Sequence, residues 1–162
     1  MSVCYSMGKT CKVCDSPISD NNTSGIGCEC RYSYNEAKRV VFFDNKERGL
    51  AYFKIEVDLY LELFIEVFET VKFRSRFKKE FYPSIKEQYE TKGYVSKKQL
   101  EICKDMLYSK GCEMELEEVY DEKKDRQRKA IEFCEFDEDE QEKIFNLANK
   151  FRHEFRANQK RG

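Results

Sequence analysis

The sequence predicts a mainly α-helical protein with a small zinc-bound N-terminal module of loops and short β-strands. Paired cysteines near the N-terminus predict the metal, and apolar residues at helical spacing from about residue 57 onward predict the helices. Serine and glycine residues at the expected helix starts and ends support the same fold class. We therefore expect a zinc-binding module over residues 1–50 and a helical domain over residues 51–162, folded as a helical bundle or as helical hairpins.

Four cysteines carry the metal prediction. Cys11 and Cys14 form a C-x-x-C pair, and Cys28 and Cys30 form a C-x-C pair after 13 intervening residues. Four thiolates at such spacing close a tetrahedral Zn²⁺ shell and leave no open position for a substrate, so we expect a structural zinc ion. The C-x-C half departs from the commoner C-x-x-C pair, so Cys4 remains an alternative to Cys28 or Cys30.

The loop between the two cysteine pairs, residues 15–27, consists largely of turn-forming residues. It has little apolar content, and zinc binding would supply on the order of 10 kcal/mol or more to its folding. After the loop, Tyr32 and Tyr34 alternate as in a strand, and the apolar residues 40–43 predict another strand followed by a turn. Residues 52–56 are expected to pair with that strand, before a helix begins near residue 57.

Proline, serine and glycine predict the next two helices. Pro83 is expected to begin a helix over residues 84–92 that ends at Gly93. Ser96 is the predicted N-cap of a helix over residues 97–110, which the following glycine closes.

Two further helices complete the expected domain. One covers about residues 114–133, and its middle, residues 122–129, is polar all round and therefore expected to be exposed. Asp137 is the predicted cap of the last helix, which has acidic residues in its first turn and basic residues near its end, as the helix dipole favours. The apolar stripe of this last helix consists of Ile144, Leu147, Ala148, Phe151 and Phe155.

Charge is abundant and unevenly distributed. Charged residues make up 38% of the 162 residues, yet the net charge is only −1, which argues against a general nucleic-acid coat protein and against a uniformly acidic DNA mimic. Residues 113–142 hold 14 acidic against 5 basic residues, and residues 143–162 hold 6 basic against 1 acidic. Residues 72–80 form a second basic segment, with 5 basic residues and 1 acidic residue.

Cysteine usage and hydropathy predict the compartment. The first ten residues lack the basic start and apolar run of a secretory signal, and no apolar stretch reaches the ~18 residues that span a bilayer. We expect a cytosolic protein without a membrane partner, in a compartment where its eight cysteines stay reduced and act as metal ligands before they form disulfides.

Catalytic residues are sparse in the sequence. The single histidine, His153, lies about 180° from Ile144 on a helix and is therefore expected at the surface, so no Ser/His/Asp or Cys/His set is predicted and the protein is not expected to be an enzyme. The acidic run over residues 137–140 could bind Mg²⁺, but a helix start explains it more simply. His153 could still complete a second zinc site with Cys103, Cys112 or Cys134, and this alternative stays open.

Two charged segments are candidate interaction surfaces. The acidic partner-binding candidates are Glu113, Glu115, Glu117, Glu118, Asp121 and Glu122. The basic candidates, which alternate with phenylalanines, are Lys72, Arg74, Arg76, Lys78 and Lys79. The basic segment could hold a nucleic-acid backbone, although phenylalanines at helical spacing are more often part of a core.

The segment over residues 81–100 has a helix–Gly–Ser–helix pattern that resembles small proteins of phages and mobile elements. Together with the cysteine module and the polarised charge, it makes the chain similar to anti-CRISPR proteins of phage origin that are directed at type II effectors. This resemblance implies a phage-borne inhibitor that acts in the host cytoplasm, where it binds a CRISPR effector nuclease of the host and blocks DNA cleavage. The alternative is a zinc-dependent nucleic-acid-binding accessory or regulatory protein of a phage or mobile element.

Overall fold

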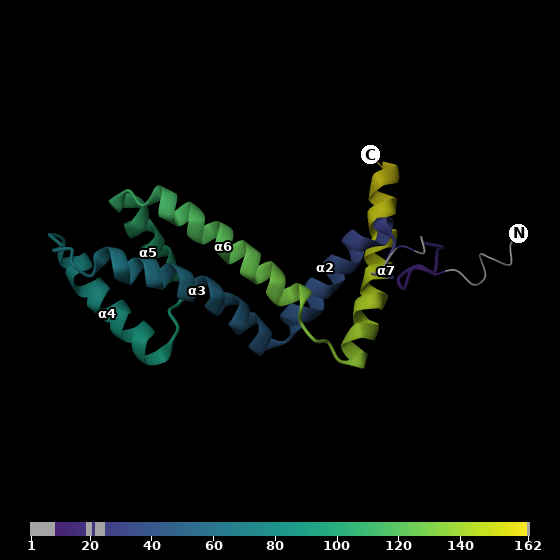
Figure 1. Ribbon diagram of the computed structural model, residues 1–162, viewed down its shortest axis with the longest axis horizontal. Coiled ribbons are helices and arrows are strands. Elements are labelled where there is room, and N and C mark those ends of the chain that lie inside the picture. The colour runs from purple at the N-terminus through teal and green to yellow at the C-terminus, as the bar shows by residue number, and fades with distance from the viewer. Residues whose placement is uncertain (1–8, 19–20, 22–24, 162) are drawn as a thin grey trace, which may run out of the picture. The chain divides into compact units, whose positions relative to one another are not determined.

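The computed structural model of the chain is mainly helical, with six helices in the part of the chain that it describes (Figure 1). That part comprises residues 9–18, 21 and 25–161, without the side chains of residues 28, 29 and 158–161. The chain forms two compact units, one from residues up to Lys46 and from Phe133 onward, and the other from Glu47–Glu132. The expected helical class is thus confirmed. The division into units differs from the expected one, because residues 133–162 group with the N-terminal residues and not with the helices that precede them.

The unit over Glu47–Glu132 is built on a long central helix. Its helices are α3 (Lys46–Phe68), α4 (Arg76–Lys92), α5 (Lys97–Lys110) and α6 (Glu113–Glu132). Helix α3 supplies Val57, Leu61 and Phe64, which are fully buried and recur at a spacing of three or four residues. Leu107 of α5 and Ile85 of α4 pack into the same cluster. Each such side chain stabilises the fold by about 1.5–3 kcal/mol through burial.

The ends of α5 follow from local capping. The Ser96 hydroxyl accepts a hydrogen bond from the Gln99 backbone N–H (3.1 Å), and the Gln99 side chain accepts one from the Ser96 N–H (2.8 Å). Gly93 and Gly111, which close α4 and α5, adopt the left-handed conformation with φ of 75° and 93°. The predicted helix over residues 97–110 and the predicted end of α4 at Gly93 are confirmed.

The predicted start of α4 was wrong. The helix begins at Arg76, after the N-cap Ser75, and Pro83 lies inside it. Pro83 is exposed, so the one helical hydrogen bond that it cannot donate leaves a carbonyl that water can reach. The helix therefore continues through the proline.

The other unit pairs α2 (Cys28–Asp44) with α7 (Glu138–Arg161). The two helices run antiparallel, because Tyr32 contacts Phe155 (ring centroids 5.6 Å apart) and Tyr34 contacts Phe145 (5.7 Å). Their shared core consists of Ala37, Val41, Ile144 and Ala148, together with residues of the cysteine loop. The alanines bury fully, which lets the two helix backbones approach closely.

Helix α7 follows its sequence pattern closely. The Asp137 carboxylate accepts a hydrogen bond from the Glu140 N–H (2.7 Å), as predicted for its cap. The stripe is buried at Ile144 and Ala148, but Phe155 at its end is 49% exposed.

Within the described residues, no helix is at once long enough and apolar enough to cross a membrane.

The strands expected in the N-terminal module are absent from the described residues. Residues 31–34 and 40–43 lie in α2, and residues 52–56 lie in α3. The cause is visible in α2, where Cys30, Ala37 and Val41 recur at intervals of seven and four residues and bury along one face. A single antiparallel bridge between Thr10 and Pro17 is the β-pairing found in the described part of the chain.

Candidate metal centre

A tight turn brings the first two cysteines together. The Asp15 N–H donates to the Cys11 carbonyl (2.8 Å), and the Cys11 N–H donates to the Ser16 carbonyl (2.8 Å). Asp15 adopts a left-handed conformation with φ of 61°, which bends the chain directly after Cys14. The C-x-x-C pair is therefore held by backbone hydrogen bonds, while Cys30 comes from the first turn of α2.

The sulfurs of Cys11, Cys14 and Cys30 all lie within 4.8 Å of one another. Cys14 Sγ and Cys30 Sγ are 3.4 Å apart, and the Gly27 backbone N–H donates to Cys11 Sγ at 3.3 Å. Four sulfurs bound tetrahedrally to zinc at about 2.3 Å stand roughly 3.8 Å from one another. The N–H donor also stabilises negative charge on sulfur. This arrangement could hold a metal ion.

Hydrogen bonding and burial shift the pKa values of the Cys14 and Cys30 thiols in opposite directions. The Ser16 hydroxyl lies 3.2 Å from the Cys14 sulfur, and this contact lowers the pKa of Cys14 to about 7. Burial raises the pKa of Cys30 to about 12. A bound cation would favour the thiolate form of both residues, because metal binding displaces thiol protons.

The fourth ligand stays a prediction, because the side chains of both candidates for it lie outside the described part of the structure. Cys28 is the first residue of α2, but its side chain lies outside the described part, and so does Cys4. Cys11, Cys14 and Cys30 therefore represent three of the four predicted ligands.

The alternative second zinc site is not assembled among the described residues. Cys103 and Cys112 are buried in the Glu47–Glu132 unit, whereas Cys134 and His153 belong to the other unit. None of these four joins a group of three or more metal-ligating side chains in the described part. Burial raises the pKa of Cys103 to about 12, which suits a packed neutral thiol.

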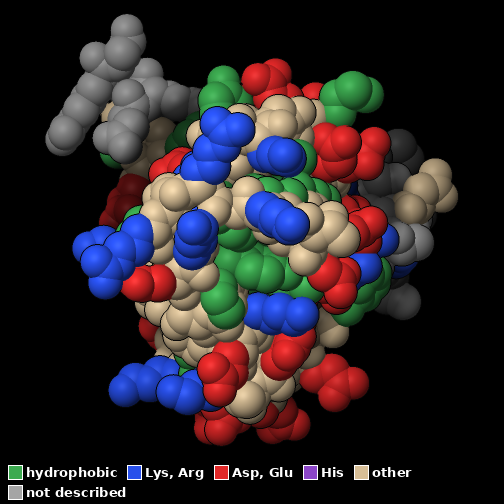
Figure 2. Space-filling model, turned by 90° about the vertical axis from the view of Figure 1, so that its left-hand side faces the viewer, with side chains coloured by type: hydrophobic (Ala, Val, Ile, Leu, Met, Phe, Trp, Pro, Cys, Tyr) green, Lys and Arg blue, Asp and Glu red, His purple; other side chains and the backbone are tan. Residues whose placement is uncertain are grey.

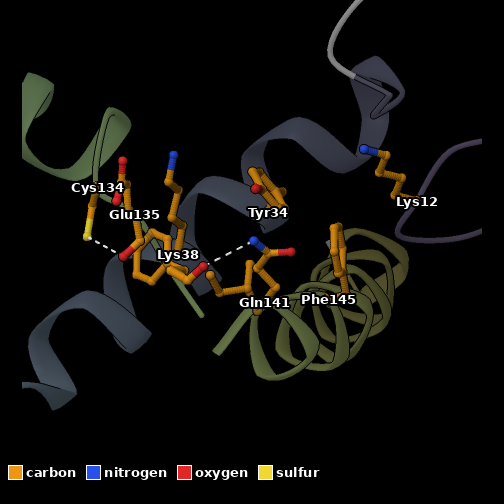
Figure 3. Close-up of a pocket in the computed structure, with 9 residues that line it drawn as sticks. Lys12, Tyr34, Lys38, Cys134, Glu135, Gln141 and Phe145 are labelled. Carbon is orange, nitrogen blue, oxygen red and sulfur yellow. Dashed lines mark hydrogen bonds between the residues drawn. The ribbon is translucent and has the colours of Figure 1, made fainter. Parts of the chain in front are cut away.

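A pocket of about 520 Å³ lies in the α2–α7 unit (Figure 3). Its lining comes from the cysteine loop, α2, the segment before α7 and α7 itself, and includes Lys12, Tyr34 and Lys38. Two of its polar side chains are directed at backbone carbonyls: Gln141 donates to Phe136 (3.1 Å), and Cys134 donates to Glu135 (3.7 Å). No sequence pattern indicated this pocket, because its residues come together only when α7 packs on α2.

The six acidic candidates all lie exposed in the first half of α6. Glu122 pairs with Arg126, but the other five form no ion pair with any described residue. Glu113, Glu117 and Asp121 share one side of the helix at a spacing of four residues. Met114, in the same turn as Glu113, is 75% exposed. An acidic surface with an apolar neighbour therefore faces solvent.

The middle of α6 contains a residue that the sequence interpretation missed. Residues 122–129 were expected to be exposed, but Gln127 is buried and donates to the Tyr52 carbonyl of α3 (3.1 Å). Lys123 lies 3.7 Å from Glu56, which also accepts from Lys104 (2.6 Å). Polar contacts therefore help to attach α6 to α3.

The fold and the thiol cluster define a two-unit helical protein with a candidate metal centre in its α2–α7 unit. A search of protein-family models, curated proteins and solved structures finds no match to the chain.

Proposed function

We propose that the protein is a non-enzymatic, zinc-stabilised inhibitor that binds a CRISPR effector nuclease of the host and blocks DNA cleavage. The observation that carries the proposal is the acidic side of α6, where Glu113, Glu117 and Asp121 are exposed and form no ion pair with any described residue. The choice of target rests on the resemblance to anti-CRISPR proteins.

Zinc has a structural role in this proposal. Cys11, Cys14 and Cys30, with Cys28 as the fourth ligand, would hold the ion and leave no position for a substrate. The thiol cluster belongs to the same apolar core as Ala37 and Ile144, so metal binding would stabilise the α2–α7 pair.

The acidic side of α6 supplies the contact with the target. A nuclease must present a basic groove to hold DNA and guide RNA. Exposed carboxylates without internal partners complement such a groove, accelerate association and make it sensitive to salt. Met114 adds an exposed apolar side chain that can be buried at the centre of the contact.

A target-cleavage assay with a purified, guide-loaded type II effector tests the proposal. The wild-type protein should inhibit cleavage and bind the effector directly. The triple change Glu113→Lys/Glu117→Lys/Asp121→Lys should lower the association rate by about tenfold or more. The matched control is Glu62→Lys/Glu66→Lys/Glu69→Lys, which reverses two exposed charges of α3 and one directly after its end, and it should leave inhibition intact.

Two outcomes would overturn the proposal. One is that both triple variants inhibit equally, because the acidic side of α6 would then have no special role. The other is tight binding to free DNA or RNA without an effect on any nuclease tested, which would favour the accessory nucleic-acid-binding protein instead.

A further inference from the structure

A second charged surface lies at the start of α4 and plays no part in the inhibitor proposal. We call it the basic surface, and it consists of Lys72, Arg74, Arg76, Phe77, Lys78 and Lys79. Figure 2 views the side of the molecule on which the α3–α4 connection lies in Figure 1, and Lys and Arg side chains border hydrophobic ones there. In Figure 1, α4 and α6 lie on opposite sides of α3.

The basic surface contains an exposed aromatic platform. Phe77 is 57% exposed, and its ring stacks on that of Phe81 with centroids 5.4 Å apart and an interplanar angle of 16°. Phe81 in turn meets the buried Phe64 edge to face (6.3 Å). The Phe77 ring is thus held in place through Phe81, which packs on the core. Part of the Phe77 ring remains exposed and can stack with another flat ring.

The charges around Phe77 are largely unpaired. Of the basic side chains in this surface, only Arg76 forms an ion pair with a described residue, and its partner Glu80 lies 3.2 Å away. Both partners of that pair are highly exposed, so the pair contributes little and Arg76 can exchange Glu80 for another anion. Lys72, Arg74 and Lys79 are exposed without an acidic partner in the described part of the chain.

The position of these charges opposes the helix dipole. Arg76, Lys78 and Lys79 are three of the first four residues of α4, where the backbone N–H groups already carry partial positive charge, and the first turn contains no acidic residue. Cations at a helix N-terminus destabilise it, so this sequence reduces the stability of α4. An anion bound at the surface would offset that cost.

We propose that the basic surface binds single-stranded nucleic acid. Phosphates would contact the lysines and arginines, and an unpaired base would stack on Phe77. A duplex keeps its base faces inside the stack, and an acidic peptide or anionic lipid has no flat ring for the platform, so the aromatic contact selects a single strand. The proposal is independent of the inhibitor function, since it uses no residue of α6.

Fluorescence anisotropy with a labelled oligo-dT of about 16 nucleotides tests the proposal on the full-length, zinc-loaded protein. Phe77→Ala should weaken binding about 5- to 150-fold, whereas Phe77→Tyr, which keeps a stacking ring, should retain it. Phe133→Ala is the matched control, because Phe133 is also an exposed phenylalanine but belongs to the other unit. It should leave binding unchanged.

A second variant tests the charges. Lys72→Gln/Arg74→Gln/Lys79→Gln should weaken binding and reduce the slope of log affinity against log salt by about 2, at roughly 0.7 per lost phosphate contact. All three residues are exposed, so the circular dichroism spectrum should not change. Glu113→Lys/Glu117→Lys/Asp121→Lys should keep oligonucleotide binding, which separates this surface from the inhibitor proposal.

Competition experiments decide the class of ligand. An unlabelled single strand should displace the probe, whereas a duplex of the same length, polyglutamate and anionic phospholipid vesicles should displace it weakly. Equal displacement by any of these three would overturn the proposal in favour of general anion binding. Absence of oligo-dT binding at about 50 mM salt, or an unchanged affinity in Phe77→Ala, would also overturn it.

Discussion

At the scale of single residues, the sulfurs of Cys11, Cys14 and Cys30 lie close enough to share one metal ion. We predict about one zinc ion per chain, measured by elemental analysis of the purified protein. Cys11→Ser/Cys14→Ser should abolish zinc binding, because it removes the pair that the turn at Asp15 positions. Cys134→Ser is the control and should retain the zinc, since Cys134 belongs to no ligand group in the described part of the chain.

The same measurement identifies the fourth ligand. Cys28→Ser should reduce zinc affinity if Cys28 completes the site, whereas Cys4→Ser should do so if Cys4 replaces it. Unchanged zinc content in Cys11→Ser/Cys14→Ser would show that these two cysteines do not bind the zinc ion.

The acidity of Cys14 gives a prediction for the zinc-free protein. Its pKa is lowered to about 7 by the Ser16 hydroxyl, and the thiolate is the form that reacts with iodoacetamide. Mapped alkylation should therefore show a Cys14 rate that rises as the pH increases through about 7. Cys30, with a pKa of about 12, should stay unreactive over that range.

Ser16→Ala provides the corresponding control. Removal of the hydroxyl should move the midpoint of the Cys14 profile to higher pH, because the thiolate loses its main stabilising contact. A profile that is identical in the two proteins would show that Ser16 does not set the acidity of Cys14.

The spacing of the cysteines predicted most of this site, because a C-x-x-C turn is determined by neighbouring residues. The contribution of Gly27, whose backbone N–H reaches Cys11, could not be predicted in this way. That contact joins residues 16 positions apart and depends on the path of the loop.

At the scale of elements, helices with local caps were predictable and those defined by distant contacts were not. Ser96 and Gln99 cap α5 through their own hydrogen bonds, so its bounds followed from the sequence. Helix α2 contains the apolar run over residues 40–43, which resembles a strand when it is considered alone. Its helical conformation buries Ala37 and Val41 in the core shared with α7, and that packing involves residues about one hundred positions further along the chain.

The close approach of α2 and α7 predicts sensitivity to side-chain volume. Ala148 is fully buried between them, so Ala148→Leu should destabilise the fold by about 1–3 kcal/mol through overpacking. The control is Ala157→Leu, on an exposed position of the same helix, which should change the free energy of unfolding by less than about 0.5 kcal/mol. Denaturant unfolding monitored by circular dichroism measures both, and equal effects would show that the helices do not pack at Ala148.

At the scale of the whole molecule, the two units have separate cores, and only the α2–α7 unit contains the thiol cluster. We predict that removal of zinc by a chelator reduces amide hydrogen-exchange protection in α2 and α7 but leaves α3–α6 protected. The reason is that Cys11 and Cys30 share a core with Ile144 and Ala148, whereas the core around Phe64 contains no residue of the cluster.

Cys11→Ser/Cys14→Ser is the control for this exchange experiment, since a chelator should not change its pattern further. Loss of protection throughout α3–α6 would contradict the separation of the two cores. The unit boundary itself was not predictable from composition, because no linker-like segment separates residues 133–162 from the helix before them.

The interruption of one unit by the other has a consequence for synthesis of the chain. All of residues 47–132 leave the ribosome between α2 and α7, which takes about 4–17 seconds at usual translation rates. During that interval the apolar side of α2 around Ala37 and Val41 has no α7 to cover it, while the intervening helices have time to fold. The nascent protein therefore completes its middle first, and the unit that carries the thiols closes only when its last helix emerges.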